Sequence, residues 1–160
     1  MRIGQRTLAL ALLLLCGCAT ARTAPPAGER ASAAVGLRLA NEMAAAASRL
    51  DVAALAKFIP QTDAVVYVSN GNPIRGNEYL KVMGDFYGTL SQLDFKWAKS
   101  ESVPISENAV AFTGWSDVHF VTKKGETETE HAVFTMVFVR GADGWKRVIA
   151  HKTVLKEPEK

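Results

Sequence analysis

The sequence predicts one α+β domain, and two patterns along the chain indicate this class. Apolar residues recur at spacings of three and four through most of residues 32–90, which is typical of amphipathic helices. Across residues 93–155, β-branched and aromatic residues dominate, and Gly125, Gly141 and Gly144 mark hairpin turns. Helices followed by hairpin-linked strands favour a fold in which three N-terminal helices pack on a strongly curved antiparallel sheet.

The first helix is predicted over residues 32–50. This stretch is rich in alanine, and Val35, Leu39 and Met43 form one apolar stripe along it. Ser32 precedes the stripe and is a suitable N-cap, because its hydroxyl can accept a hydrogen bond from the first turn.

A second, short helix and a strand are predicted next. Asp51 is expected to cap a helix over residues 52–58, and Pro60 ends it because the residue before a proline disfavours helical geometry. The β-branched run at residues 64–69 predicts a strand, which the Asn-Gly-Asn-Pro sequence at residues 70–73 ends in a turn.

The third helix is predicted to begin at Gly76, with Tyr79, Met83 and Phe86 on its apolar face. Strand patterns account for the rest of the domain. They are predicted over residues 93–97, 109–121, 127–140 and 145–155.

Both faces of the two longest predicted strands are apolar. In the strand over residues 109–121, Phe112 lies on one face and Trp115 and Val121 on the other. The strand over residues 127–140 has the same character. Because the helices can cover only one face of the sheet, we expect the outer face to pack against a second copy in a homodimer.

The first seventeen residues have the pattern of a secretory signal peptide. Arg2 and Arg6 supply positive charge before the apolar run of residues 8–15, which is shorter than the roughly 20 residues of a membrane-spanning helix. The following Leu-Cys-Gly-Cys sequence, residues 15–18, resembles the lipobox of bacterial lipoproteins, in which a small residue precedes the acylated cysteine.

The lipobox resemblance implies that Cys18 is lipidated and becomes the first residue of the mature chain. Cleavage before Cys16 would instead follow Leu15, a bulky residue where the peptidase requires a small one. Removing residues 1–17 takes two of the 19 basic residues and leaves 17 against 16 acidic residues, so the net charge falls from +3 to about +1. The alternative is a soluble periplasmic protein in which the cysteine has no such role.

The same reasoning sets the expected organisation and location. Residues 18–31 form the lipidated cysteine and a flexible tether, residues 32–155 the domain, and residues 156–160 a polar tail. In Gram-negative lipoproteins, alanine rather than aspartate after the cysteine, here Ala19, implies an outer-membrane anchor facing the periplasm. The mature chain has no basic tract of the kind that binds nucleic acid, so we expect no such partner.

The order of elements resembles the SnoaL-like domains of the nuclear transport factor 2-like superfamily. Residues 50–58 and the Asp-Ala-Val-Val-Tyr sequence at residues 63–67 resemble its short helix and the acidic start of its first strand. The Pro-Ile-Arg-Gly turn at residues 73–76 resembles the turn before its third helix. Residues 134–140, with Gly-Trp, His and Thr further along, resemble its closing strands and those of the association domain of calmodulin-dependent kinase.

This resemblance covers about residues 32–155. It implies a cone-shaped sheet wrapped around helices, also called a cystatin-like α+β roll, that dimerises through its outer face. The superfamily contains isomerases, polyketide cyclases, dehydratases, ligand binders and assembly modules, so the fold alone does not specify an activity.

An acid–base pair is predicted on one strand. Trp115, Asp117 and His119 alternate and therefore share one face, where the carboxylate can orient the imidazole and raise its basicity. The alternative is that Asp117 and His119 are solvent-facing strand residues.

Ligand-binding residues are predicted from the last strand and from scattered aromatic residues. Arg147 and His151 are expected to share a face of the last strand, where the planar guanidinium of Arg147 can hold an anionic ligand group. An alternative structural role remains open for His151. The aromatic residues expected to line a pocket are Tyr67, Tyr87, Trp97 and Trp115.

Several kinds of site have no signature in the sequence. There is no HExxH motif, cysteine cluster, nucleophile elbow, phosphate-binding loop or dinucleotide fingerprint, so we predict neither a metal nor a cofactor. His119 and His131 are on strands that should pair, so they can meet across the ladder. The alternation of Glu126, Glu128 and Glu130 is interpreted as a solvated strand face.

Three functions follow from these observations, and the first is favoured. In the first, the chain is expected to be a lipid-anchored envelope protein whose domain binds a small, partly apolar molecule in a cone-shaped pocket, without established catalysis. The second is an isomerase, lyase or hydrolase that uses Asp117 and His119 as acid–base groups. The third is a dimeric assembly module of an envelope complex.

Overall fold

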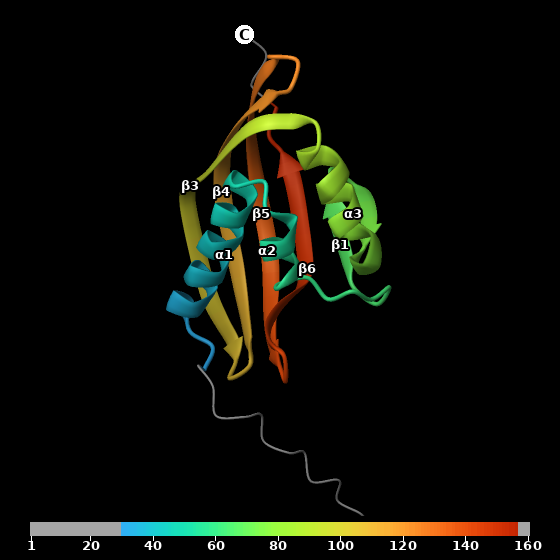
Figure 1. Ribbon diagram of the computed structural model, residues 1–160. Coiled ribbons are helices and arrows are strands. Elements are labelled where there is room, and N and C mark those ends of the chain that lie inside the picture. Colours follow the sequence, from blue (N-terminus) through green and yellow to red (C-terminus); the bar gives the residue numbers. More distant parts are fainter. Residues whose placement is uncertain (1–29, 157–160) are drawn as a thin grey trace, which may run out of the picture.

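A computed structural model describes residues 30–156 and confirms the predicted α+β class (Figure 1). The elements are, in chain order, α1 (Ala33–Ser48), α2 (Val52–Ala56), β1 (Val66–Ser69), β2 (Asn72–Arg75), α3 (Gly76–Tyr87), β3 (Leu90–Ser106), β4 (Ala109–Thr122), β5 (Thr127–Gly141) and β6 (Gly144–Val154). The predicted signal peptide, Cys18, most of the predicted tether and residues 157–160 lie outside the described residues.

The sheet has six strands in the order β2-β1-β6-β5-β4-β3, and it is mixed rather than wholly antiparallel. Strands β3 to β6 follow one another as antiparallel hairpins, whereas β1 pairs in parallel with β6. The prediction of a fully antiparallel sheet was wrong at this one junction. A strand as short as β1 carries no periodicity that specifies its partner, so only the folded chain reveals the pairing.

Strand β2 replaces part of the predicted turn at residues 70–73. Asn70 and Gly71 both adopt positive φ angles, 49° and 85°, which is the geometry of a tight type I′ hairpin turn. The chain therefore reverses within two residues, and Asn72 and Pro73 already belong to β2. Pro73 is tolerated there because β2 is an edge strand, where the missing N–H breaks no ladder bond.

Both predicted helix caps are present. The Ser32 hydroxyl accepts a hydrogen bond from the backbone N–H of Val35 at 3.2 Å, at the start of α1. The Asp51 carboxylate accepts one from the N–H of Ala54 at 2.8 Å, at the start of α2. Each interaction satisfies a backbone donor that has no partner inside the helix.

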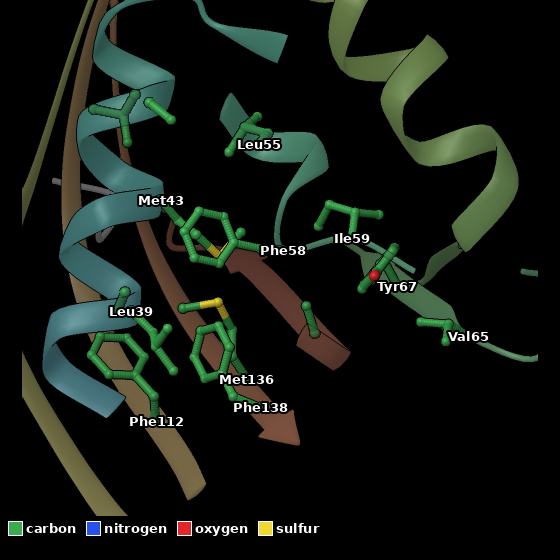
Figure 2. Packing of buried hydrophobic residues seen from close by; sticks show 14 of the residues in the cluster. Leu39, Met43, Leu55, Phe58, Ile59, Val65, Tyr67, Phe112, Met136 and Phe138 are labelled. Carbon is green, nitrogen blue, oxygen red and sulfur yellow. The ribbon is translucent and has the colours of Figure 1, made fainter. Parts of the chain in front are cut away.

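All three helices lie on one side of the sheet, which we call the inner face, and the opposite side is the outer face (Figure 1). Helix α1 packs closely against β3 and β4 at Gly36, where a Cβ would clash with Ser102 Oγ and lie 2.9 Å from Val110 Cγ2. The core fills the space between α1, α2 and the inner face, where Leu39 and Met43 of α1 and Phe112 of β4 belong to one cluster of buried residues (Figure 2).

A bulge in β6 changes which side chains reach the inner face. Ile149 pairs with Val137, but the next pair along the ladder joins Arg147 to Phe138, which leaves Val148 as an extra residue on β6. On β6, the side chains that face the helices are therefore at odd-numbered positions before the bulge, such as Arg147, and at even-numbered positions after it, such as Ala150.

Helix length also bears on the relation of the domain to a membrane. Across residues 30–156, no helix has both the length and the apolar character needed to cross a bilayer.

Candidate functional site

A cavity of about 420 Å³ lies between the helices and the inner face of the sheet. Met43 from α1, Met83 from α3 and Met136 from β5 contribute to its largely apolar wall. Val82 and Phe86 of α3 also line it and remain 42% and 39% exposed, so the cavity opens to solvent beside α3.

An aromatic cluster forms one wall. The ring of Trp97, on β3, lies 4.8 Å from that of Phe95 and 5.6 Å from that of Phe134, in edge-to-face contacts. Gly114 makes room for Trp97, because a Cβ at this position would lie 2.6 Å from the indole Cε3. Trp97 thus lines the cavity, as predicted, and its indole N–H donates to the carbonyl of Ala40 at 3.4 Å.

Arg147 lies at the opposite end of the wall and is only 3% exposed. Its guanidinium carbon is 4.3 Å from the ring centroid of Tyr67 and 4.5 Å from that of Tyr79, so the charge lies over two aromatic faces. Its backbone is held as well: its N–H donates to the carbonyl of Phe58 at 2.7 Å, and its carbonyl accepts from the Tyr67 hydroxyl at 2.9 Å.

Among the described residues, the guanidinium of Arg147 has no acidic partner, and two of its nitrogens have no acceptor. Within residues 30–156, neither Nε nor Nη2 has a hydrogen-bond partner, although both are buried. An arginine stays charged at any ordinary pH, so burial cannot be relieved by losing a proton. In the described part of the cavity wall, Arg147 is therefore the cation without an anionic partner, since Lys152 pairs with Glu130.

Two tyrosines beside Arg147 are held in the neutral form. Burial raises the pKa of Tyr67, and the positive charge of Arg147 opposes that rise only in part. Burial also raises the pKa of Tyr87, with Tyr79 adding to the rise. Both hydroxyls are protonated near neutral pH, as those of tyrosines ordinarily are, and can donate hydrogen bonds. Tyr67 and Tyr87 line the cavity, as predicted.

An ion pair completes the polar lining. Lys152 Nζ and Glu130 Oε1 are 2.6 Å apart, and both side chains are mostly buried. The interpretation of Glu126, Glu128 and Glu130 as a solvated face was therefore wrong for Glu130. That residue pairs with Val118 on the inner face and reaches the cavity, whereas the other two are exposed nearer the hairpin end.

The predicted acid–base residues share one face, but it is the outer one. Asp117 Oδ1 lies 2.7 Å from Nδ1 of His131, its cross-strand neighbour, and His119 Nδ1 instead lies 3.2 Å from Thr129 Oγ1. The expected pairing of Asp117 with His119 is not formed. Residues on one strand that are two apart lie farther from each other than directly opposed cross-strand residues.

The structure places two further predicted ligand-binding residues outside the cavity. Trp115 is on the outer face, where Lys99 Nζ lies 5.0 Å from its ring centroid. His151 is exposed on the outer face, because the bulge at Val148 separates it from Arg147. The expectation that Arg147 and His151 share a face was wrong for this reason.

The sequence reasoning did not identify Tyr79, Glu130 and Lys152 as cavity residues. Tyr79 was assigned to the apolar face of its helix, and that periodicity does not distinguish a cavity wall from packed core. No group of three or more histidine, cysteine, aspartate or glutamate side chains is placed to hold a metal ion among the residues described.

Comparison with known proteins gives one family and a shared fold. A family model described as a SnoaL-like domain matches residues 37–155. No curated protein sequence matches the chain significantly.

Solved structures resemble this one at low sequence identity. A nuclear transport factor 2-like superfamily protein from Salmonella enterica superposes with a TM-score of 0.68 at 14% identity, covering 79% of this chain and 94% of its own. A candidate dehydratase of the NTF2-like family from Streptomyces avermitilis gives 0.66 at 18%, covering 78% and 97%. A candidate calcium/calmodulin-dependent protein kinase II association domain from Xanthomonas campestris gives 0.65 at 11%, covering 82% and 97%.

Proposed function

This chain belongs to the SnoaL-like domain family, and on that premise we propose that its cavity binds a small, largely apolar molecule. The observation that carries the proposal is the cavity itself, about 420 Å³ in volume with aromatic and aliphatic walls and few polar groups. That combination is typical of small-molecule sites, whose volumes range from roughly 300 to 1,000 Å³.

The cost of such a cavity supports the proposal. Protein interiors are close-packed, and each unfilled volume removes dispersion contacts and destabilises the fold. Trp97, Phe95 and Phe134 pack against one another along the wall and leave the space between the helices and the sheet open. A ligand that enters the cavity recovers these contacts, so its binding should raise the stability of the folded chain.

A cavity-filling substitution tests the proposal. We expect uncharged apolar probes, 2-naphthamide and 4-phenylbutanamide, to raise the melting temperature of the full chain. Ala47→Trp, at a cavity-lining position of α1, should abolish this rise, and Ala34→Trp, at an exposed position of the same helix, should leave it intact. The proposal fails if neither these probes nor carboxylic acids of the same shape stabilise the wild type, or if Ala47→Trp responds as the wild type does.

The enzymatic alternative lacks a comparable observation. The cavity wall formed by the described residues contains no histidine or aspartate, and its protic side chains are tyrosines, a serine, Arg147, Lys152 and Glu130. Catalysis by Asp117 and His119 would require a substrate on the outer face. The name of the Streptomyces relative supports an enzymatic role only by analogy of fold.

We also propose that the outer face forms a homodimer. Ile149 is 52% exposed there, and Val133 and Val137 are half-buried beside it in the single chain. Exposed apolar surface on a sheet face is typical of an interface. The lipid anchor at Cys18 and the outer-membrane location, facing the periplasm, remain proposals that rest on the sequence pattern.

A further inference from the structure

We propose that the ligand of the cavity is an apolar monocarboxylic acid, whose carboxylate pairs with Arg147. This inference rests on the proposed function, because it specifies the chemistry of a molecule that the cavity is proposed to bind. It is carried by a buried arginine that lines the cavity and has no acidic partner in the described chain.

The unpartnered atoms of Arg147 have the geometry of a carboxylate receptor. Nε and Nη2 form one edge of the guanidinium, from which two N–H bonds point in parallel. Neither has an acceptor within residues 30–156. A carboxylate presents two oxygens at matching spacing and accepts both hydrogen bonds at once, in the bidentate arrangement that makes arginine its usual receptor.

The surrounding groups cannot satisfy this edge themselves. The hydroxyl of Tyr67 donates its proton to the carbonyl of Arg147, and although its oxygen also interacts with the Arg147 side chain, which opposes the burial-driven rise in the pKa of Tyr67, neither Nε nor Nη2 has a hydrogen-bond partner among the described residues. The rings of Tyr67 and Tyr79 stabilise the cation through their faces, and such contacts supply no acceptor to Nε or Nη2. Among the described residues, the site therefore lacks an acceptor for Nε and Nη2 of Arg147.

The charges in the cavity wall favour a monoanion. Lys152 and Glu130 form an ion pair and neutralise each other, so Arg147 leaves the lining with one excess positive charge. A carboxylate matches that charge. A phosphate brings more negative charge and three acceptor oxygens, which a wall this apolar does not satisfy.

The position of Arg147 also orients the ligand. The carboxylate lies at the end of the cavity beside β1 and β6, and the apolar body extends toward Trp97 and Phe134. Nε and Nη2 are covered by neighbouring atoms, so a ring must move aside when the acid binds. Half-buried Tyr79, on α3, is less confined than Tyr67, which is 2% exposed.

Matched acids and amides test the inference. Binding of 2-naphthoate and 4-phenylbutyrate to the full chain is measured by calorimetry at pH 7.5 beside 2-naphthamide and 4-phenylbutanamide. Each pair has nearly the same shape, and only the acid carries charge. We expect each acid to bind at least ~10-fold more tightly than its amide, the factor that a charge-assisted hydrogen bond typically provides.

Variants of Arg147 then assign the difference to one residue. Arg147→Met should remove the preference for acids and keep the affinity for amides, and Arg147→Lys should retain a reduced preference because an ammonium lacks the planar fork. Lys96→Met removes an equal charge from an exposed position on the outer face and should change neither affinity. If Arg147→Met does not fold, the acid preference of the wild type is compared with that of Arg147→Lys, and an equal preference in the two overturns the assignment to Arg147.

The possible outcomes separate the two proposals. Amides that bind as tightly as acids overturn the carboxylate assignment and leave the proposed function standing. Binding of none of the four probes overturns the proposed function itself. Tighter binding of naphthalene-2-phosphonate than of 2-naphthoate overturns the argument from charge, and an acid preference that survives Arg147→Met overturns the assignment to this residue.

Discussion

Replacing Arg147 by methionine should make the folded chain more stable, although the residue is among its most deeply buried. A buried charge without an ionic partner costs about 3–5 kcal/mol. The rings of Tyr67 and Tyr79, both within 4.5 Å of the guanidinium carbon, return about 2 kcal/mol because they share one charge. The difference predicts a gain of about 1–3 kcal/mol, since methionine keeps most of the hydrocarbon packing and leaves both backbone hydrogen bonds in place.

Urea unfolding followed by tryptophan fluorescence measures this gain, and calorimetry should show a melting temperature higher by roughly 3–5 °C per kcal/mol. Arg140→Met is the matched control on the neighbouring strand, because Arg140 Nε donates to Asn108 Oδ1 at 3.0 Å. Removing that satisfied arginine should cost about 1–3 kcal/mol. A loss of more than about 1 kcal/mol for Arg147→Met, similar to that of Arg140→Met, would refute the claim that Arg147 is uncompensated.

Three further predictions concern other parts of the molecule. Because burial raises the pKa values of Tyr67 and Tyr87 above the usual 10.0, the unfolded chain loses these protons first, and stability that is complete below pH 10 should fall as pH rises further. Above pH 10, the free energy of unfolding should fall by about 1.4 kcal/mol per pH unit for each tyrosine. Urea titrations between pH 8 and 11 measure this fall, and Tyr87→Phe should make it less steep. An equally steep fall in Tyr87→Phe contradicts the burial effect. Val137→Glu should convert a dimer to a monomer in light scattering, because it places a charge in the proposed interface, and a wild type that is already monomeric excludes that interface. Cys18→Ala should abolish incorporation of labelled palmitate in a bacterial host, whereas Cys16→Ala should leave it unchanged; labelling that persists in Cys18→Ala contradicts the anchor.

The helices and three of the four hairpin strands could be predicted because their signals are local, whereas β3 (Leu90–Ser106) extends well beyond the predicted residues 93–97. The stripe of Val35, Leu39 and Met43 became the buried side of α1, and Ser32 and Asp51 capped helices as their side chains allow. The parallel pairing of β1 with β6 could not be predicted, since it joins residues more than eighty positions apart through a four-residue strand.

Part of the candidate site could be predicted by residue, but the sequence did not show which of the predicted residues share the cavity. Tyr67, Tyr87, Trp97 and Arg147 line the cavity, whereas Trp115, Asp117, His119 and His151 are on the outer face. Alternation along β4 correctly grouped Asp117 with His119 but could not show which face covers the cavity. On β6 the alternation itself failed, because the one-residue bulge is not encoded in any periodic pattern.

The cavity and the unpaired arginine are two separate costs to stability, and both occur at one place. Gly114 removes a side chain so that Trp97 can stand along the wall, and Arg147 brings a charge into the same apolar enclosure. Selection for stability alone would favour larger side chains in this space and an uncharged residue at position 147, because cavities and unpaired buried charges both destabilise a fold. An acid with an apolar body removes both costs together, since its body restores the missing contacts and its carboxylate supplies the missing acceptor. The coincidence of the two defects is therefore better explained by one amphiphilic ligand than by two independent features of packing.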